Sequence, residues 1–326
     1  MRLAAVLLGL CGALFLISLV TGPAPVSAAD SLAALFFDDG TTMSVVMREI
    51  RLPRALLALM IGASLGLAGA AMQGYLRNPL AEPGLIGVSA AAGLGAVLSL
   101  QTGIAAVFAL ALPVSALTSA LIAVGLILSL AGPRGSSLTL ILAGIAISAL
   151  ASALTSLVLN LSPNPFAAAE IVFWMLGSLA DRSFEHVWIA LPFMAAGWVL
   201  LASLGRGLDA LTLGEDTAAA MGVRLPRLRL ALVIGTAASV GAATAVAGAI
   251  GFVGLVVPHV LRPFVGARPS ALLWASALGG GVMVLAADIA VRLLLPDRDL
   301  KLGVLMALVG APLFLHLIYK TRAEMR

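Results

Sequence analysis

The chain contains little charge and almost no cysteine. Charged residues make up 10% of its 326 residues, whereas hydrophobic residues make up 61%. A soluble domain has roughly a quarter of its residues charged, so this composition excludes a water-soluble globular protein and predicts a polytopic membrane protein. The single cysteine, Cys11, lies in an apolar run without a partner, which excludes disulfides, zinc sites and thiol catalysis as organising features.

Motifs for ATP hydrolysis and metal binding are also missing. Neither Lys301 nor Lys320 follows a glycine, so the chain has no P-loop to hold ATP phosphates. The three histidines, His186, His259 and His316, lack the spacing of metal ligands. We therefore expect no resident cofactor or metal. The net charge of +4 suits loops that orient a membrane protein, and it does not imply a nucleic-acid partner.

Long apolar runs without alternation predict spanning helices and not strands. We expect an all-α fold in a single transmembrane domain, residues 1–326, with ten spans. The predicted spans are residues 3–20, 55–74, 84–100, 104–130, 138–161, 187–204, 230–250, 251–265, 271–295 and 302–319. Residues 26–29, Val-Ser-Ala-Ala, also fit a signal-peptidase site, so cleavage after the first span stays an alternative.

The distribution of basic residues predicts the orientation. An even number of spans puts both termini on one side, and a cytoplasmic location places most Lys and Arg inside. Arg48, Arg51 and Arg54 then crowd on the outside, against this trend. Small-residue-rich helices run into Pro/Gly turns at residues 74–84 and 248–258, which predicts an inverted-topology repeat.

A polar segment, residues 208–229, interrupts the apolar sequence before the seventh span. Gly214 precedes Glu215 and Asp216, acids that the helix dipole favours in a first turn, and Gly222 suits a left-handed helix end. We predict a short cytoplasmic helix that lodges in a groove of a soluble subunit. A solvated loop is the alternative.

Asp288 is the one acid well inside an apolar run, and Arg292 follows it by four residues. This spacing predicts an ion pair within one helix. Because carboxylates inside membranes often carry protons, a proton-coupled secondary transporter that uses Asp288 is the alternative function.

Several long motifs occur in order along the chain, and together they resemble the permease subunits of the FecCD family. These are membrane components of type II ABC importers for iron siderophores, haem and cobalamin. The motifs lie at residues 51–54, 72–74, 77–87, 213–216, 221–223, 251–259, 286–288 and 310–312.

The resemblance implies a homodimer of ten-helix subunits in the bacterial inner membrane. Two cytoplasmic ABC ATPases would hold the ATP and magnesium, and a periplasmic binding protein would deliver the substrate. The implied docking residues for the glutamates of that protein are Arg51, Arg54 and Arg292. The implied ATPase-coupling residues are Leu213, Gly214, Glu215, Asp216, Ala219, Met221 and Gly222.

The translocation path should lie between the two copies, along the fifth span and the segment that follows it. Its expected residues are Phe173, Trp174, Met175, Leu176, Gly177, Ser178, Leu179 and Arg182. Arg182 would meet an anionic ligand such as a haem propionate, or it is a loop charge. The run Asp299-Leu-Lys-Leu-Gly303 departs from the Glu-Leu-Pro-Val-Gly that is typical of the family, which leaves the shape of the last external loop open.

Overall fold

The computed structural model describes residues 2–22, 28–36, 40–108, 110–132, 137–162, 165–294 and 300–324. Within them the regular structure is helical and contains no strand, which confirms the all-α prediction. The elements are α1 (Arg2–Val20), α2 (Ala28–Phe36), α3 (Thr42–Val45), η1 (Val46–Arg51), α4 (Leu52–Leu76), η2 (Pro83–Ile86), α5 (Val88–Gln101), α6 (Ile104–Val107), α7 (Ala111–Ala131), α8 (Ser137–Asn160), α9 (Pro165–Met175), α10 (Phe184–Ser203), α11 (Gly205–Leu211), α12 (Glu215–Ala220), α13 (Leu225–Ala247), α14 (Val253–Leu261), η3 (Arg262–Val265), α15 (Pro269–Leu294) and α16 (Leu302–Glu324).

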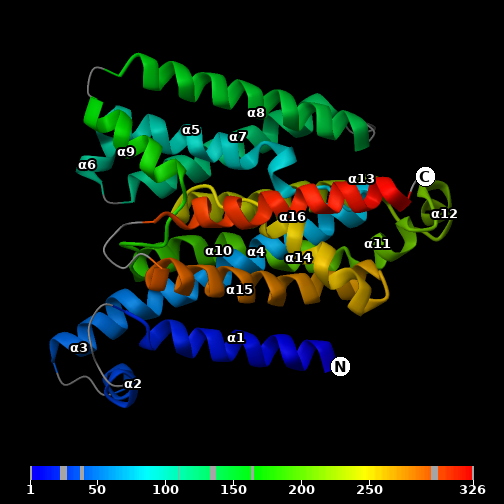
Figure 1. Cartoon of the computed structure of the whole chain (residues 1–326). Coiled ribbons are helices and arrows are strands. Elements are labelled where there is room, and N and C mark those ends of the chain that lie inside the picture. Colours follow the sequence, from blue (N-terminus) through cyan, green and yellow to red (C-terminus); the bar gives the residue numbers. More distant parts are fainter. Residues whose placement is uncertain are drawn as a thin grey trace.

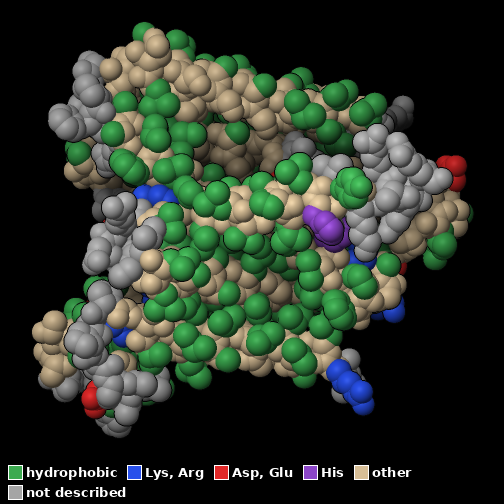
Figure 2. Space-filling model, in the orientation of Figure 1, with side chains coloured by type: hydrophobic (Ala, Val, Ile, Leu, Met, Phe, Trp, Pro, Cys, Tyr) green, Lys and Arg blue, Asp and Glu red, His purple; other side chains and the backbone are tan. Residues whose placement is uncertain are grey.

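The long helices lie side by side in one direction (Figure 1). Both chain termini lie at the end of the bundle that carries α12, whereas α2, α3 and α6 lie at the opposite end. On the face shown in Figure 2, apolar side chains cover the middle and charged side chains gather toward the two ends. This distribution is that of a bundle crossing a bilayer, where the hydrocarbon core excludes charge.

Among the described residues, seven helical segments are long and apolar enough to cross a membrane: α1, residues 42–76, α7, residues 138–160, α10, α13 and α15. Three shorter apolar helices, residues 88–101, 253–265 and 302–316, cover the remaining predicted runs. The predicted run 104–130 is not continuous, because α6 ends at Val107 and α7 begins at Ala111. The short helices α5 and α14 each follow a left-handed residue, Gly87 with φ 78° and Phe252 with φ 67°.

The close packing of α4 against α15 depends on small residues. A Cβ atom at Gly62 would collide with the backbone of Gly280, and one at Gly66 with the carbonyl oxygen of Ser276. Such contact lets two backbones approach where lipid supplies no hydrophobic drive for association. On the other side of α15, α1 packs with its buried Cys11, whose Sγ donates to the carbonyl of Leu278 at 3.3 Å.

The two Pro/Gly turns that were predicted to be repeat counterparts lie against each other. The amide of Gln73 donates to the carbonyls of Ala81, Gly254 and Leu255, each at 3.3 Å. The Oε1 atom of Glu82 accepts from the backbone N–H of Phe252, at the N-terminus of α14, at 2.9 Å. A carboxylate is favoured at that helix end. Glu82 thus holds the start of α14, a role that its place in a motif did not predict.

Candidate translocation and docking sites

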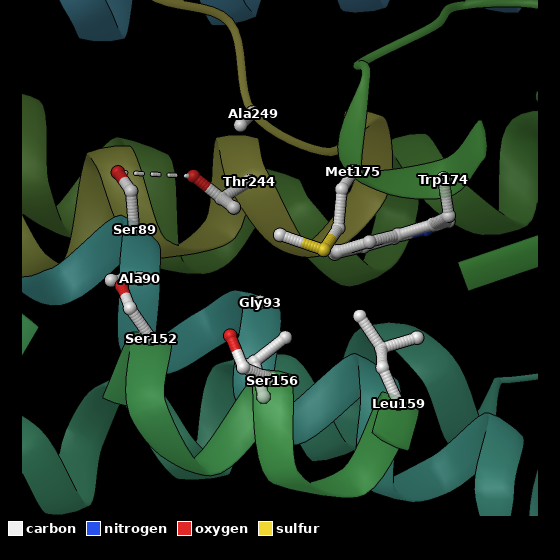
Figure 3. A pocket seen from close by; sticks show the side chains of 11 residues that line it. Ser89, Ala90, Gly93, Ser152, Ser156, Leu159, Trp174, Met175, Thr244 and Ala249 are labelled. Carbon is white, nitrogen blue, oxygen red and sulfur yellow. Dashed lines mark hydrogen bonds between the residues drawn. The ribbon is translucent and has the colours of Figure 1, made fainter. Parts of the chain in front are cut away.

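A cavity of about 270 Å³ lies among α5, α8, α9 and α13 (Figure 3). Helix α8 contains the predicted fifth span and contributes one wall, while Ser89 on α5 and Thr244 on α13 face each other across another part (Figure 3). Their hydroxyl oxygens lie 3.4 Å apart. The lining residues are Ser89, Ala90, Gly93, Ser152, Thr155, Ser156, Leu159, Trp174, Met175, Thr244 and Ala249.

Only part of the predicted path segment reaches this cavity. Trp174 and Met175 line it, from the end of α9. Phe173 and Leu176 are exposed, whereas Leu179 is in the core at 1% exposure. Gly177 and Ser178 join the surrounding loops through their backbone: the N–H of Ser178 donates to Ala247 and the carbonyl of Gly177 accepts from Gly303. The path assignment of the segment therefore stays a prediction.

Arg182 is half-buried in the loop before α10, and its Nε atom has no hydrogen-bond partner among the described residues. Burial lowers the pKa of this guanidinium below its ordinary value, and the nearby carboxylate of Asp181 opposes that shift. The assignment of Arg182 to an anionic ligand therefore stays a prediction, with a loop charge as its alternative.

The short helix that was predicted in the polar segment is present as α12, with the expected glycines at its ends; its role in ATPase coupling stays a prediction. Gly214 at φ 105° precedes it and Gly222 at φ 88° follows it, and Glu215 and Asp216 occupy its first turn. The apolar side chains of Leu213 and Met221 are each 62% exposed. Asp216, Ala219 and Gly222 are exposed as well, while Ala218 faces the protein. Helix α12 and its flanking residues thus present apolar and acidic side chains to the surroundings.

The polar segment is less uniform than its sequence suggested. Leu208 and Leu211 lie on a separate helix, α11, and are buried in the core. Arg229, at the other end of the segment, is also buried, and its Nη2 donates to the carbonyl of Gly132 at 2.8 Å. Leu208 and Leu211 are three residues apart, so both lie on the face of α11 that packs against the core. The exposed residues of the segment therefore lie in and beside α12 and at the start of α13.

Asp209, on α11, connects the polar segment to the long helix α15. Its carboxylate accepts from the backbone N–H of Ser270 at 2.8 Å, the hydroxyl of Ser270 at 2.7 Å and Nε of Arg268 at 2.9 Å. Burial alone would raise the pKa of Asp209, but these hydrogen bonds and the Arg268 charge outweigh it and lower the pKa. The carboxylate thereby caps the N-terminus of α15 and joins α11 to it.

Arg51 was expected to face a partner protein, but it is only 5% exposed. Its Nη1 donates to the carbonyls of Leu19 at 3.0 Å and Val20 at 3.4 Å, at the C-terminal end of α1. A helix C-terminus carries unsatisfied carbonyls and a partial negative charge, which a cation stabilises. In this structure Arg51 therefore acts as a cap for α1.

Arg54 and Arg292 share the carboxylate of Asp288. The Nη2 atom of Arg54 lies 2.9 Å from Oδ1, and the Nη2 atom of Arg292 lies 2.9 Å from Oδ2. The side chain of Asp288 is 1% exposed, that of Arg292 11% and that of Arg54 19%. The predicted pair with Arg292 is confirmed. The pair with Arg54 was not predicted, because the two residues are 234 positions apart.

Arg292 also holds the C-terminal end of α1. Its Nη1 donates to the carbonyls of Ser18 at 2.9 Å and Thr21 at 2.8 Å, and Nη2 donates to the Ser18 hydroxyl at 2.6 Å. The three predicted docking arginines thus surround one carboxylate and one helix end. With three guanidiniums and one carboxylate, the group keeps a net positive charge.

Comparison with known proteins gives matches along most of the chain. The model of the FecCD transport family matches residues 10–320. The uncharacterized ABC transporter permease protein YvrB of Bacillus subtilis is 38% identical over 274 residues, which is 82% of this chain and 77% of that protein. The vitamin B12 import system permease protein BtuC of Citrobacter koseri is 38% identical over 275 residues, 84% of this chain and 83% of that protein.

A solved structure has the same fold. It is an inward-facing conformation of a metal-chelate type ABC transporter, with a TM-score of 0.86 and 34% sequence identity, covering 98% of this chain and 99% of that one. The family match, the relatives and the apolar helix bundle agree on one identity. The chain belongs to the FecCD transport family and is an ABC transporter permease of the bacterial inner membrane.

Proposed function

We propose that the chain is the membrane subunit of an importer that moves an iron chelate, haem or cobalamin inward, driven by a separate ATPase. The observation that carries this proposal is α12, a short helix with exposed Leu213 and Met221 at one end of an apolar bundle. An exposed apolar side chain beside acids suits a protein partner. The ATPase would hold ATP and magnesium, since this chain has no P-loop.

The similarity to BtuC, a permease for vitamin B12 import, supports cobalamin as the substrate class, and the metal-chelate type transporter supports a chelate in general. Both are bulky molecules with polar groups on their rims. We place the path along α8 and the end of α9, between two copies of the chain. Trp174 and Met175 would then face the passing ligand.

The assembly proposed is a homodimer of ten-span subunits with an inverted repeat, two ATPases and one periplasmic binding protein. Both termini lie at the α12 end of the bundle, which we assign to the cytoplasm because the ATPase docks there. The Arg51, Arg54 and Arg292 cluster then lies at the periplasmic end, where it would attract carboxylates of the binding protein. Charge pairs of this kind orient partners and speed their encounter.

The energetic requirement is a difference in affinity. The ATPase dimer must favour one conformation of the permease when ATP is bound and another after hydrolysis, because equal affinity for both would shift nothing. A rigid connection from α12 into the membrane serves this purpose. Asp209, which caps α15, provides one such connection.

The test is ATP-driven uptake into liposomes that contain the permease and its ATPase, with loaded binding protein outside. Glu215→Arg should abolish uptake and co-purification of the ATPase, because it reverses a charge in the exposed first turn of α12. The matched control is Glu185→Arg, the same charge change at an exposed residue of α10, which should keep the ATPase bound. Normal uptake by Glu215→Arg would contradict the proposal.

The same liposomes distinguish the alternative, a proton-coupled carrier that uses Asp288. Such a carrier would accumulate ligand from a proton gradient without the ATPase. In the structure both carboxylate oxygens of Asp288 are already bonded to internal arginines, so neither oxygen faces a proton path. Gradient-driven uptake without ATPase would overturn the ATP-driven proposal.

A further inference from the structure

Hydroxyl groups from three helices converge on the cavity of Figure 3. Ser152, Thr155 and Ser156 stand at positions i, i+3 and i+4 of α8, so they share one face of that helix. Ser89 on α5 and Thr244 on α13 complete the set. Ser89 and Thr244 already bond each other, so the three hydroxyls of α8 are the ones left for a ligand.

The three hydroxyls of α8 on the cavity wall are available to a ligand. Thr102, Thr118, Ser129, Ser203 and Ser239 each donate to a carbonyl three or four residues earlier in their own helix. Among the described residues, Ser152, Thr155 and Ser156 make no such bond. A helix hydroxyl that does not back-bond can donate to a group outside its helix. These three instead point to an external partner.

The rest of the lining defines the chemistry of that partner. None of the residues that the structure places on the cavity wall is charged, and Trp174, Met175 and Leu159 give it apolar surface. A carboxylate would enter without a cation to pair with, which is unfavourable in a dry site. An uncharged amide on an aliphatic stem matches both the hydroxyls, which donate and accept, and the apolar wall.

The size limits how much of a ligand can enter. At about 270 Å³, the cavity is at or below the lower end of pockets that take drug-sized molecules, roughly 300 to 1,000 Å³. It can therefore hold one arm of a bulky chelate but not the whole molecule. We propose that this hydroxyl site binds an uncharged amide arm of the transported chelate. The inference rests on the proposed import function and deepens it.

The test is equilibrium binding of radiolabelled cyanocobalamin, which carries primary amide arms, to the permease–ATPase complex in nanodiscs. Replacing Ser152 and Ser156 by alanine and Thr155 by valine should weaken binding by about tenfold or more, since each lost hydrogen bond to an uncharged group costs a few-fold. The matched control, Ser203→Ala, removes a hydroxyl that bonds its own helix and should leave affinity unchanged.

A second variant keeps the test independent of folding. Wild type should prefer cyanocobalamin to a derivative whose amide arms are hydrolysed to carboxylates, and Ser156→Lys should reverse this preference by supplying a cation. Equal affinity of wild type and the triple variant would overturn the inference, as would ATP-driven uptake of haem but not cyanocobalamin. In either case the importer itself would still stand, whereas loss of all ATP-driven chelate uptake by wild type would overturn the proposed function.

Discussion

At the scale of single residues, the buried charges carry the most information. Asp288 was predicted to pair with Arg292 from a spacing of four, and the structure confirms this. The contacts of Arg54 with Asp288, and of Arg51 with the end of α1, join residues far apart in sequence. Spacing along one helix cannot reveal them. The crowding of basic residues on the outer side indicated that these arginines have a function. It did not indicate that they bond groups within the same chain.

Asp288→Asn should destabilise the permease markedly. The change leaves two guanidiniums without their shared carboxylate, and breaking a buried ion pair from one side costs about 3 to 5 kcal/mol in soluble proteins. We expect a clear fall in the apparent melting temperature of the detergent-solubilised protein. Arg54→Met combined with Asp288→Met should recover part of the loss, because it removes one charge of each sign. Similar melting of wild type and Asp288→Asn would contradict the ion-pair role.

At the scale of helices, the sequence located the apolar runs well and their ends less well. Each predicted span overlaps an apolar helix. Helices α5 and α14 are shorter than the apolar runs that predict them, because the chain turns at Gly87 and at Phe252 inside those runs. Hydropathy reports how apolar a run is, but it does not detect a left-handed residue that ends a helix inside that run. The role of Glu82 was also missed, because its partner is a backbone N–H at the start of α14, far away in the sequence.

The contact between α4 and α15 should tolerate no added side chain. Gly66→Val would bring a branched side chain against the carbonyl of Ser276, and overpacking commonly costs about 1 to 3 kcal/mol even where side chains can move. We expect low yields of folded protein by size-exclusion chromatography. The control is Gly12→Val on α1, where a Cβ meets nothing within 4 Å. Equal yields for both variants would show that the helices separate easily.

The Asp209 cap should matter most near neutral pH. Asp209→Ala removes the acceptor at the start of α15 and should lower stability by about 1 kcal/mol, as for other helix caps; Asp209→Asn should lose less because it can still accept from Ser270. The pKa of Asp209 is below its ordinary 3.8 in the folded protein. Its ionic contribution is therefore complete above that value and disappears as pH falls through the lowered pKa.

Thermal melts at pH 7 and at a series of pH values below 3.8 check this expectation for Asp209. The difference in melting temperature between wild type and Asp209→Asn should narrow as the pH falls through the lowered pKa, because the wild-type carboxylate then takes up a proton and no longer pairs as an anion with Arg268. A gap that stays constant or widens toward acid would mean that Asp209 acts through its shape alone.

At the scale of the whole molecule, each end of the bundle carries one of the two proposed docking features. The α12 end carries exposed acids in Glu215 and Asp216, whereas the opposite end carries the three arginines around Asp288. The sequence could place both features, because each lies in a polar interruption between apolar runs. It could not show that one long helix, α15, bears Ser270 at one end and Asp288 at the other.

Helix α15 therefore connects both proposed docking regions. Its first turn is capped by Asp209 from the coupling region, and its last turns hold the carboxylate that Arg54 and Arg292 share. Its glycines are packed against α4 along the way. Displacement at either end would have to move α4 and α15 together, since their backbones touch.

Docking of the binding protein should depend on the net charge of the arginine cluster. Arg54→Gln removes one positive charge from the most exposed side chain of the cluster. Asp288 still pairs with Arg292, so the variant should fold. We expect association with the binding protein to slow several-fold at low salt, because long-range attraction raises encounter rates. Screening at about 0.5 M salt should abolish most of the difference. Stopped-flow or surface-plasmon measurements on nanodiscs follow the rate.

The matched control for that measurement is Arg227→Gln, which removes the same charge from an exposed residue near the start of α13, at the α12 end. If the docking surface is the arginine end, this variant should associate at the wild-type rate at every salt concentration. An equal slowing by both variants would mean that only the overall charge of the molecule steers the partner. No slowing by Arg54→Gln would mean that the internal contacts of the cluster with Asp288 and α1 are its whole purpose.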